Sequence, residues 1–172
     1  ILALIALFVG LMPAGTTLAS DPGSGTITTS SGSLEYTGGP FFVPNVSPTA
    51  GAADVDFVCP DFTASCDKFE LEVDLAAAEE GTFDLVIKHE WGDDAADFDI
   101  YLTAPDGTVL NSAASSSNPE LISQCGISAD YEIIIVPFAP LGQSYEATVE
   151  LVERESSCAG GATDGTGELP VP

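Results

Sequence analysis

Polar and apolar residues alternate along much of this chain with a period of two residues, which is typical of β-strands that bury one face. Between residues 68 and 75, one face is apolar and the other carries Lys68, Glu70, Glu72 and Asp74. The apolar face consists of Phe69, Leu71, Val73 and Leu75. The same alternation recurs over residues 83–88, 97–102 and 144–152. Such strands are stable only when their apolar faces pack together in a second layer.

Other segments predict further strands with weaker patterns. Residues 131–136 form a nearly continuous apolar run, which predicts a strand that is covered on both faces. Pro105-Asp106-Gly107 is a turn signal between two strands. Short strands are also predicted over residues 25–29, 33–36, 108–110 and 119–123. No helical periodicity of useful length follows residue 19, so we expect an all-β antiparallel sandwich of eight to ten short strands.

The first twelve residues are apolar apart from Gly10, and small residues follow them. This pattern predicts a signal peptide over residues 1–19, truncated at its N-terminus because it has no initiator methionine and no basic region. Cleavage after Ala19 is favoured, since Thr17 and Ala19 are then the small residues at the third and first positions before the cut. The run is short for a membrane span, which needs about 20 apolar residues. A core helix or a retained anchor is the alternative.

The rest of the chain divides by composition into three segments. Residues 20–53 are rich in Gly, Ser, Thr and Pro and predict one or two edge strands, with a flexible linker as the alternative. Residues 54–154 are expected to form the sandwich, and residues 155–172 a C-terminal linker or tail. Within the first segment, Phe41-Phe42-Val43 is apolar enough that we expect it to pack on a sheet.

Four cysteines in an exported chain predict two disulfides. Four cysteines permit three pairings, and the short separation of Cys59 from Cys66 favours a local bond that leaves Cys125 to pair with Cys158. A zinc site is a poor alternative, because the chain has no C-x-x-C motif and its one histidine is His89. We therefore expect an extracellular or cell-surface location, with no membrane insertion after signal cleavage.

The chain is strongly acidic, with 27 Asp and Glu residues against three Lys and Arg, for a net charge of −24. Nucleic acid is disfavoured as a partner, because phosphate binding uses basic side chains that this chain lacks. Anionic membranes are disfavoured for the same reason. The charge fits a soluble acidic secreted protein or a halophilic one, since concentrated salt screens repulsion between like charges.

The order of the motifs over residues 65–152 is informative beyond the strands themselves. F-E-L-E-V is followed by D-F-D-I-Y-L-T-A-P-D-G, then by Y-E-I-I-I-V-P-F and G-Q-S-Y-E-A-T-V. This order resembles the bacterial pre-peptidase C-terminal domain, a secreted jelly-roll-like sandwich attached to peptidases and other exported enzymes. The chain departs from that family at Asp130, where a glycine often precedes the Tyr-led strand. The resemblance implies a non-catalytic accessory module, in some members calcium-dependent and in others bound to a polymeric substrate.

An acidic turn and the strand after it are the candidate metal site. Asp93, Asp94, Asp97 and Asp99 supply four carboxylates within seven residues, and calcium takes six to eight oxygen ligands. Asp97 and Asp99 share one strand face, and the turn could fold back toward them. The spacing does not match an EF-hand loop. A solvated acidic loop, or an Asp97 that binds only backbone amides of the turn, is the alternative to a calcium site.

Catalytic signals are weak, and we expect no enzyme. A Ser-His-Asp triad would require His89, which shares the strand face of Leu85 and Ile87 and is better explained as a packed side chain. Trp91 and Tyr101 are candidates for a sugar-binding aromatic surface, although packing at the core edge is the more common role.

Two functions remain. The first is an accessory module that binds calcium together with a polysaccharide or protein polymer, a cell surface, or an adjacent domain of the same protein. The second is a structural or assembly component of an extracellular surface.

The charge imbalance leads to a first prediction. Raising NaCl to about 2 M should raise the thermal unfolding midpoint, because salt screens the repulsion among the excess carboxylates. The Debye length, over which charges still interact, is only about 3 Å at 1 M salt. Thermal melts across a salt series measure this effect. A flat or falling midpoint would reject halophilic adaptation without affecting the predicted fold.

Overall fold

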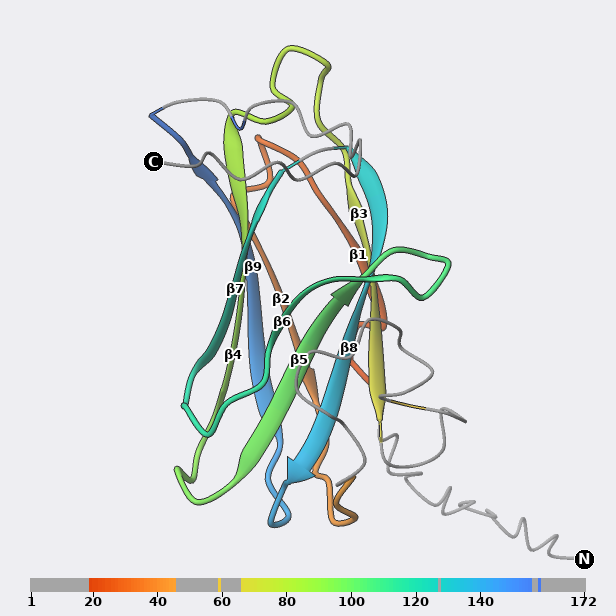
Figure 1. The fold of residues 1–172 in the computed structure, drawn as a ribbon, viewed down its shortest axis with the longest axis vertical. Coiled ribbons are helices and arrows are strands. Elements are labelled where there is room, and N and C mark those ends of the chain that lie inside the picture. Colours follow the sequence, from red (N-terminus) through yellow and green to blue (C-terminus); the bar gives the residue numbers. More distant parts are fainter. Residues whose placement is uncertain (1–18, 46–58, 60–65, 127, 156–157, 159–172) are drawn as a thin grey trace, which may run out of the picture.

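The computed structural model describes residues 19–45, 59, 66–126, 128–155 and 158. These residues form nine β-strands and no helix, and the strands lie in two facing layers (Figure 1). The strands are β1 (Ser24–Ile27), β2 (Ser33–Gly38), β3 (Asp67–Val73), β4 (Phe83–Trp91), β5 (Asp97–Thr103), β6 (Val109–Ala113), β7 (Glu120–Cys125), β8 (Ala129–Ala139) and β9 (Tyr145–Glu153). The all-β sandwich predicted from the alternation is confirmed.

The two layers are a five-stranded sheet, ordered β1-β3-β8-β5-β6, and a four-stranded sheet, ordered β2-β9-β4-β7. Every strand pair is antiparallel except β1 with β3, which is parallel. Consecutive strands β3 to β5 therefore alternate between the sheets, and the chain crosses the sandwich repeatedly. Among the described residues, no helix is long and apolar enough to cross a membrane.

The core lies between the sheets and consists of the apolar side chains that point inward from every second position of the strands. In β3, Phe69, Leu71 and Val73 are buried inward, while Glu70 and Glu72 on the opposite face are exposed. In β4, Leu85 and Ile87 are fully buried by the same rule. The periodicity thus predicted both the strands and the faces that they bury.

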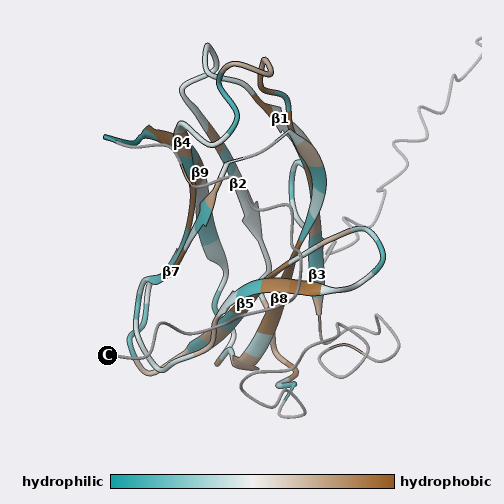
Figure 2. Cartoon of the chain, turned by 45° about the horizontal axis from the view of Figure 1, so that its top comes forward, coloured by the Kyte–Doolittle hydropathy of each residue, from teal (hydrophilic) through white to brown (hydrophobic). Residues whose placement is uncertain are grey.

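Strand β8 is the central strand of its sheet and is covered on both faces, as its apolar run predicts. Tyr131, Ile133 and Ile135 face the main core. Ile134 and Val136 belong to a second cluster, on the outer face, with Tyr101 and the Cys59 end of a disulfide. Figure 2 shows apolar residues along much of β8.

Two disulfides are present, with the predicted pairing. Cys59 bonds to Cys66 and Cys125 bonds to Cys158. The second bond joins the end of β7 to a residue beyond β9, where the Cys158 amide also donates to the Gly81 carbonyl at 2.8 Å. No described cysteine is free.

The Phe41-Phe42-Val43 segment packs only in part. Phe41 is 1% exposed and contacts Phe98 and Tyr145 in the core. Phe42 and Val43 are 73% and 57% exposed. Of this segment, only the Phe41 side chain therefore packs in the core.

At one end of the sandwich, a polar contact joins the two sheets. Tyr145 at the start of β9 donates a hydrogen bond of 2.7 Å to Asp67 at the start of β3. Gly38 at the end of β2 lies against this pair, and a Cβ at this position would be 2.5 Å from Tyr145 Oη and 2.6 Å from Asp67 Oδ2. Residue 38 must therefore lack a side chain for the two sheets to meet here.

Replacing this glycine tests the importance of the contact. Gly38→Ala should lower the free energy of unfolding by about 1–3 kcal/mol, the usual cost of forcing extra volume into a packed site. Denaturant unfolding gives the value. Gly23→Ala is the control, because its Cβ would have no neighbour closer than the Ser20 carbonyl oxygen at 3.6 Å. Equal stability of the two variants would show that the Tyr145 and Asp67 side chains relax without cost.

Candidate functional site

His89 lies inside the core and contacts no solvent. It is fully buried, its Nε2 is 2.6 Å from the Tyr36 hydroxyl, and its ring stacks on Tyr145. Burial lowers the pKa of His89 to about 3, so the imidazole is neutral at physiological pH. This position supports the packing role expected from the sequence, because a base that acts on a substrate must be reachable from solvent.

The two candidate binding aromatics are also interior residues. Trp91 is 7% exposed, donates its indole N–H to the Ala96 carbonyl at 3.0 Å and packs against Phe98. Tyr101 is fully buried in the outer cluster over β8, and its hydroxyl has no hydrogen-bond partner among the described residues. Both rings are buried in this structure, and a sugar-binding role for them stays a prediction from the sequence.

The first two carboxylates of the acidic turn have local partners. Asp93 accepts a hydrogen bond of 3.0 Å from the Ala95 amide, which closes the turn. Asp94 accepts one of 3.0 Å from the side-chain amide of Asn118 in the β6–β7 connection. These contacts satisfy each carboxylate on its own and do not aim the two groups at one ligand.

The other two carboxylates form a second, more buried group with Glu120 of β7. Asp99 is 7% exposed, and burial together with the charges of Asp97 and Glu120 raises its pKa to about 7. Burial and the charge of Glu120 also raise the pKa of Asp97, whose Oδ1 has no described partner. Glu120 accepts two hydrogen bonds from Ser115, at 2.7 and 2.6 Å.

The four aspartates predicted as calcium ligands do not come together in one group. Within the described ranges, no three or more His, Cys, Asp or Glu side chains are grouped so that they could hold a metal ion. The four aspartates predicted as ligands are divided between turn contacts and the buried group with Glu120. Calcium binding stays a prediction from the sequence.

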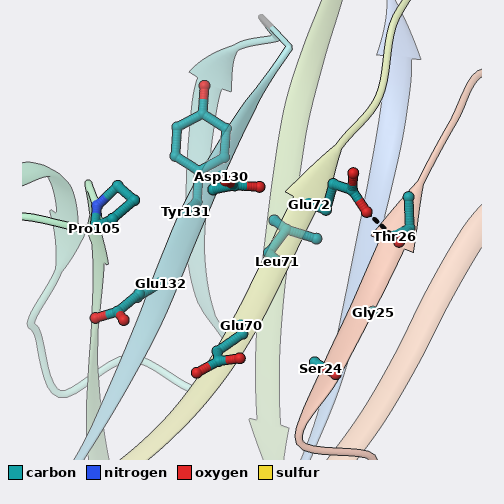
Figure 3. A pocket seen from close by; sticks show the side chains of 10 residues that line it. All are labelled: Ser24, Gly25, Thr26, Glu70, Leu71, Glu72, Pro105, Asp130, Tyr131 and Glu132. Atoms are coloured by element: carbon teal, nitrogen blue, oxygen red, sulfur yellow. Dashed lines mark hydrogen bonds between the residues drawn. The ribbon is translucent and has the colours of Figure 1, made fainter.

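A groove that carries functional groups lies on the outer face of the five-stranded sheet. It has a volume of about 510 Å³ and crosses β1, β3 and β8 (Figure 3). Its lining residues are Ser24, Gly25, Thr26, Glu70, Leu71, Glu72, Pro105, Asp130, Tyr131 and Glu132. Four of these residues carry carboxylates, and they come from the polar faces of β3 and β8.

The strand register places these carboxylates opposite one another. Glu70 pairs with Glu132 and Glu72 pairs with Asp130 across the antiparallel ladder. Like charges in direct cross-strand positions destabilise a sheet. Lys68 relieves the first pair, since its Nζ is 3.3 Å from Glu70 and 2.9 Å from Glu132.

The second pair has no described cation beside it. Glu72 accepts a hydrogen bond of 2.7 Å from the Thr26 hydroxyl of β1, and Asp130 is exposed at the other side of the pair (Figure 3). The groove therefore offers acidic groups and a hydroxyl to a cationic ligand. The sequence showed the polar faces of both strands, but only their register shows that acid faces acid.

No protein-family model matches this chain, and no curated protein matches it significantly. The likeness to the pre-peptidase C-terminal domain thus depends on the quoted motifs alone.

The buried group at Asp99 leads to a pH prediction. The folded pKa of about 7 lies above the value of about 3.9 in an unfolded chain. Stability from this group is therefore complete below about pH 4 and is lost as the pH rises through 7. Asp99→Asn should raise the unfolding midpoint at pH 8 by roughly 5 °C and weaken the pH dependence between 4 and 8.

Thermal melts from pH 4 to pH 8 measure this difference, with the exposed Asp74→Asn as the matched control for loss of one charge. If both variants follow the wild-type curve, Asp99 is not the buried acid that the structure indicates. Calcium added at pH 8 extends the test: an ion held by Asp99 would stabilise the wild type and leave Asp99→Asn unchanged.

Proposed function

We propose that this chain is a secreted, non-catalytic accessory module that binds a cationic segment of another protein through the acidic groove over β1, β3 and β8. The observation that carries the proposal is the cross-strand pairing of Glu72 with Asp130 inside that groove. A lysine or arginine placed between these two carboxylates would relieve their repulsion and gain two charge-assisted hydrogen bonds.

The form of the groove favours an extended ligand. It lies on an open sheet face and is bordered on one side by the edge strand β1, and Ser24 and Thr26 supply hydroxyl groups along that side. A peptide in extended conformation repeats its side chains every two residues, as the strands of the groove do. Alternate basic side chains could then meet Glu72 and Asp130 first and the partly neutralised pair Glu70 and Glu132 next.

Other features support the secreted and non-catalytic parts of the proposal. Two disulfides indicate folding in an oxidising environment. The histidine is enclosed in the core, and the motif order is similar to that of a family of accessory domains. The net charge of −24 adds long-range attraction for a basic partner, which speeds association at low ionic strength.

Removing two groove charges tests the proposal. Glu72→Gln combined with Asp130→Asn should weaken binding of a labelled Lys-Thr repeat peptide by about five-fold. Each exposed ion pair contributes up to about 1 kcal/mol of binding free energy. Fluorescence anisotropy at 0.15 M NaCl measures the dissociation constant. The unfolding midpoint of this variant should stay equal or rise, because the mutations also remove cross-strand repulsion.

A matched variant distinguishes binding in the groove from nonspecific attraction to the net negative charge of the protein. Glu35→Gln with Glu153→Gln also removes two charges, and both residues are exposed on β2 and β9 of the other sheet. Equal losses of affinity in the two double variants would show nonspecific attraction to an acidic protein and would overturn the proposal.

A further inference from the structure

The first described residue, Ala19, is exposed, and the next residue, Ser20, is buried, at 7% exposure. The Ser20 hydroxyl lies 3.0 Å from the Tyr145 hydroxyl and donates to the Lys68 carbonyl at 3.3 Å. The next residue, Asp21, is fixed to Thr37 by two backbone hydrogen bonds of 2.8 and 3.2 Å. Ser20 is therefore held in a defined polar site between the two sheets.

The backbone nitrogen of Ser20 points at a buried carboxylate. It donates a hydrogen bond of 2.9 Å to Asp67 Oδ1. Asp67 is 4% exposed, and its other described donors are the Lys68 amide at 2.7 Å and the Tyr145 hydroxyl at 2.7 Å. All of these donors are neutral, and burial raises the pKa of Asp67 in this setting. A buried carboxylate without a cationic partner is destabilising.

The basic side chains of the protein have carboxylate partners on the surface. Lys68 pairs with Glu70 and Glu132, Lys88 with Glu90, and Arg154 with Asp84. A further positive charge next to Asp67 can come from a chain terminus, because an α-amino group is protonated at neutral pH. The atom already in position for that charge is the nitrogen of Ser20.

We propose that hydrolysis of the Ala19–Ser20 bond creates an α-ammonium group at Ser20 that forms a buried ion pair with Asp67. Water adds across the amide bond, so Ala19 leaves with a carboxylate and the Ser20 amine takes up a proton. The enzyme required is an endopeptidase that cuts after a small residue, as signal peptidases do. The inference uses the export and cleavage site expected from the sequence and is independent of the acidic groove.

This pairing makes processing part of the stability of the fold. Before the cut, a single amide N–H meets Asp67; after it, an ammonium with three N–H groups and a positive charge occupies the same place. The Asp67 carboxylate also accepts from Tyr145, whose ring packs on His89 and Phe41. The new charge therefore acts on the contact that joins the two sheets.

A one-residue insertion provides the test. The full chain is exported from a bacterial host, either unchanged or with one glycine inserted between Ala19 and Ser20, and mass spectrometry defines each mature N-terminus. Thr17 and Ala19 keep their positions before the cut, so the insertion variant should begin with Gly followed by Ser20. Its ammonium then lies one residue away from Asp67, and its unfolding midpoint at pH 7 should be lower by roughly 5 °C or more.

Two further measurements keep the result specific. Combining the insertion with Asp67→Asn should abolish or reverse its effect, because no carboxylate remains to pair with the ammonium. Titration of the unmodified α-amino group, followed through the ¹³C shift of the labelled N-terminal Cα, does not need the double variant to fold: the amine at Ser20 should titrate above the ordinary range of about 7.7–8.0, and that of the inserted glycine within it. The stabilising effect should persist below that range and disappear as the pH rises through the higher pKa.

A mature chain that begins elsewhere than Ser20, equal midpoints for the two chains, or an ordinary α-amino pKa at Ser20 would each overturn the inference. Peptide binding in the groove should be the same for both chains. Failure of the ion pair is thus distinguishable from failure of the proposed binding function.

Discussion

The hydrogen bond between Tyr145 and Asp67 links the two sheets at the end of the sandwich where β3 and β9 begin, and the packing at this end depends on it. It joins the first residues of β9 and β3, which belong to different sheets. The ring of Tyr145 then packs on His89, Phe41 and Phe98, so one residue carries both the polar and the aromatic contacts of this end. Because a buried hydroxyl and a buried carboxylate each need a partner, the pair specifies how the sheets meet as well as holding them together.

The second constraint on the molecule is its charge. Most large apolar side chains of β3 and β8 lie in the core or in the outer cluster, and the outward positions of both strands include several acids. Antiparallel pairing then sets Glu70 against Glu132 and Glu72 against Asp130. One lysine reaches the first pair. The repulsion that remains makes this face more favourable for a cationic partner than for a neutral one.

The sequence predicted the strands well because alternation is a local property, and a buried face imposes it on every strand. The disulfide pairing followed from chain separation, and the burial of β8 from its continuous apolar run. Register and the depth of each side chain are not local. Asp99 and Tyr101 share the outward face of β5, yet both are buried, Tyr101 within the outer apolar cluster. Trp91 lies at the end of β4, where only the three-dimensional turn shows that its N–H reaches Ala96.

The contact between Ser20 and Asp67 joins residues 47 positions apart, and no pattern in the sequence relates them. The proposed role of this contact combines a local signal, the small residues before the predicted cleavage site, with the position of Ser20 in the folded protein. Disulfides form and persist in oxidising environments, and under the proposed cleavage the Ser20 ammonium forms only after the cut. In that proposal, the uncleaved chain lacks the charge at the junction between the sheets, and a chain in a reducing compartment also lacks the covalent links.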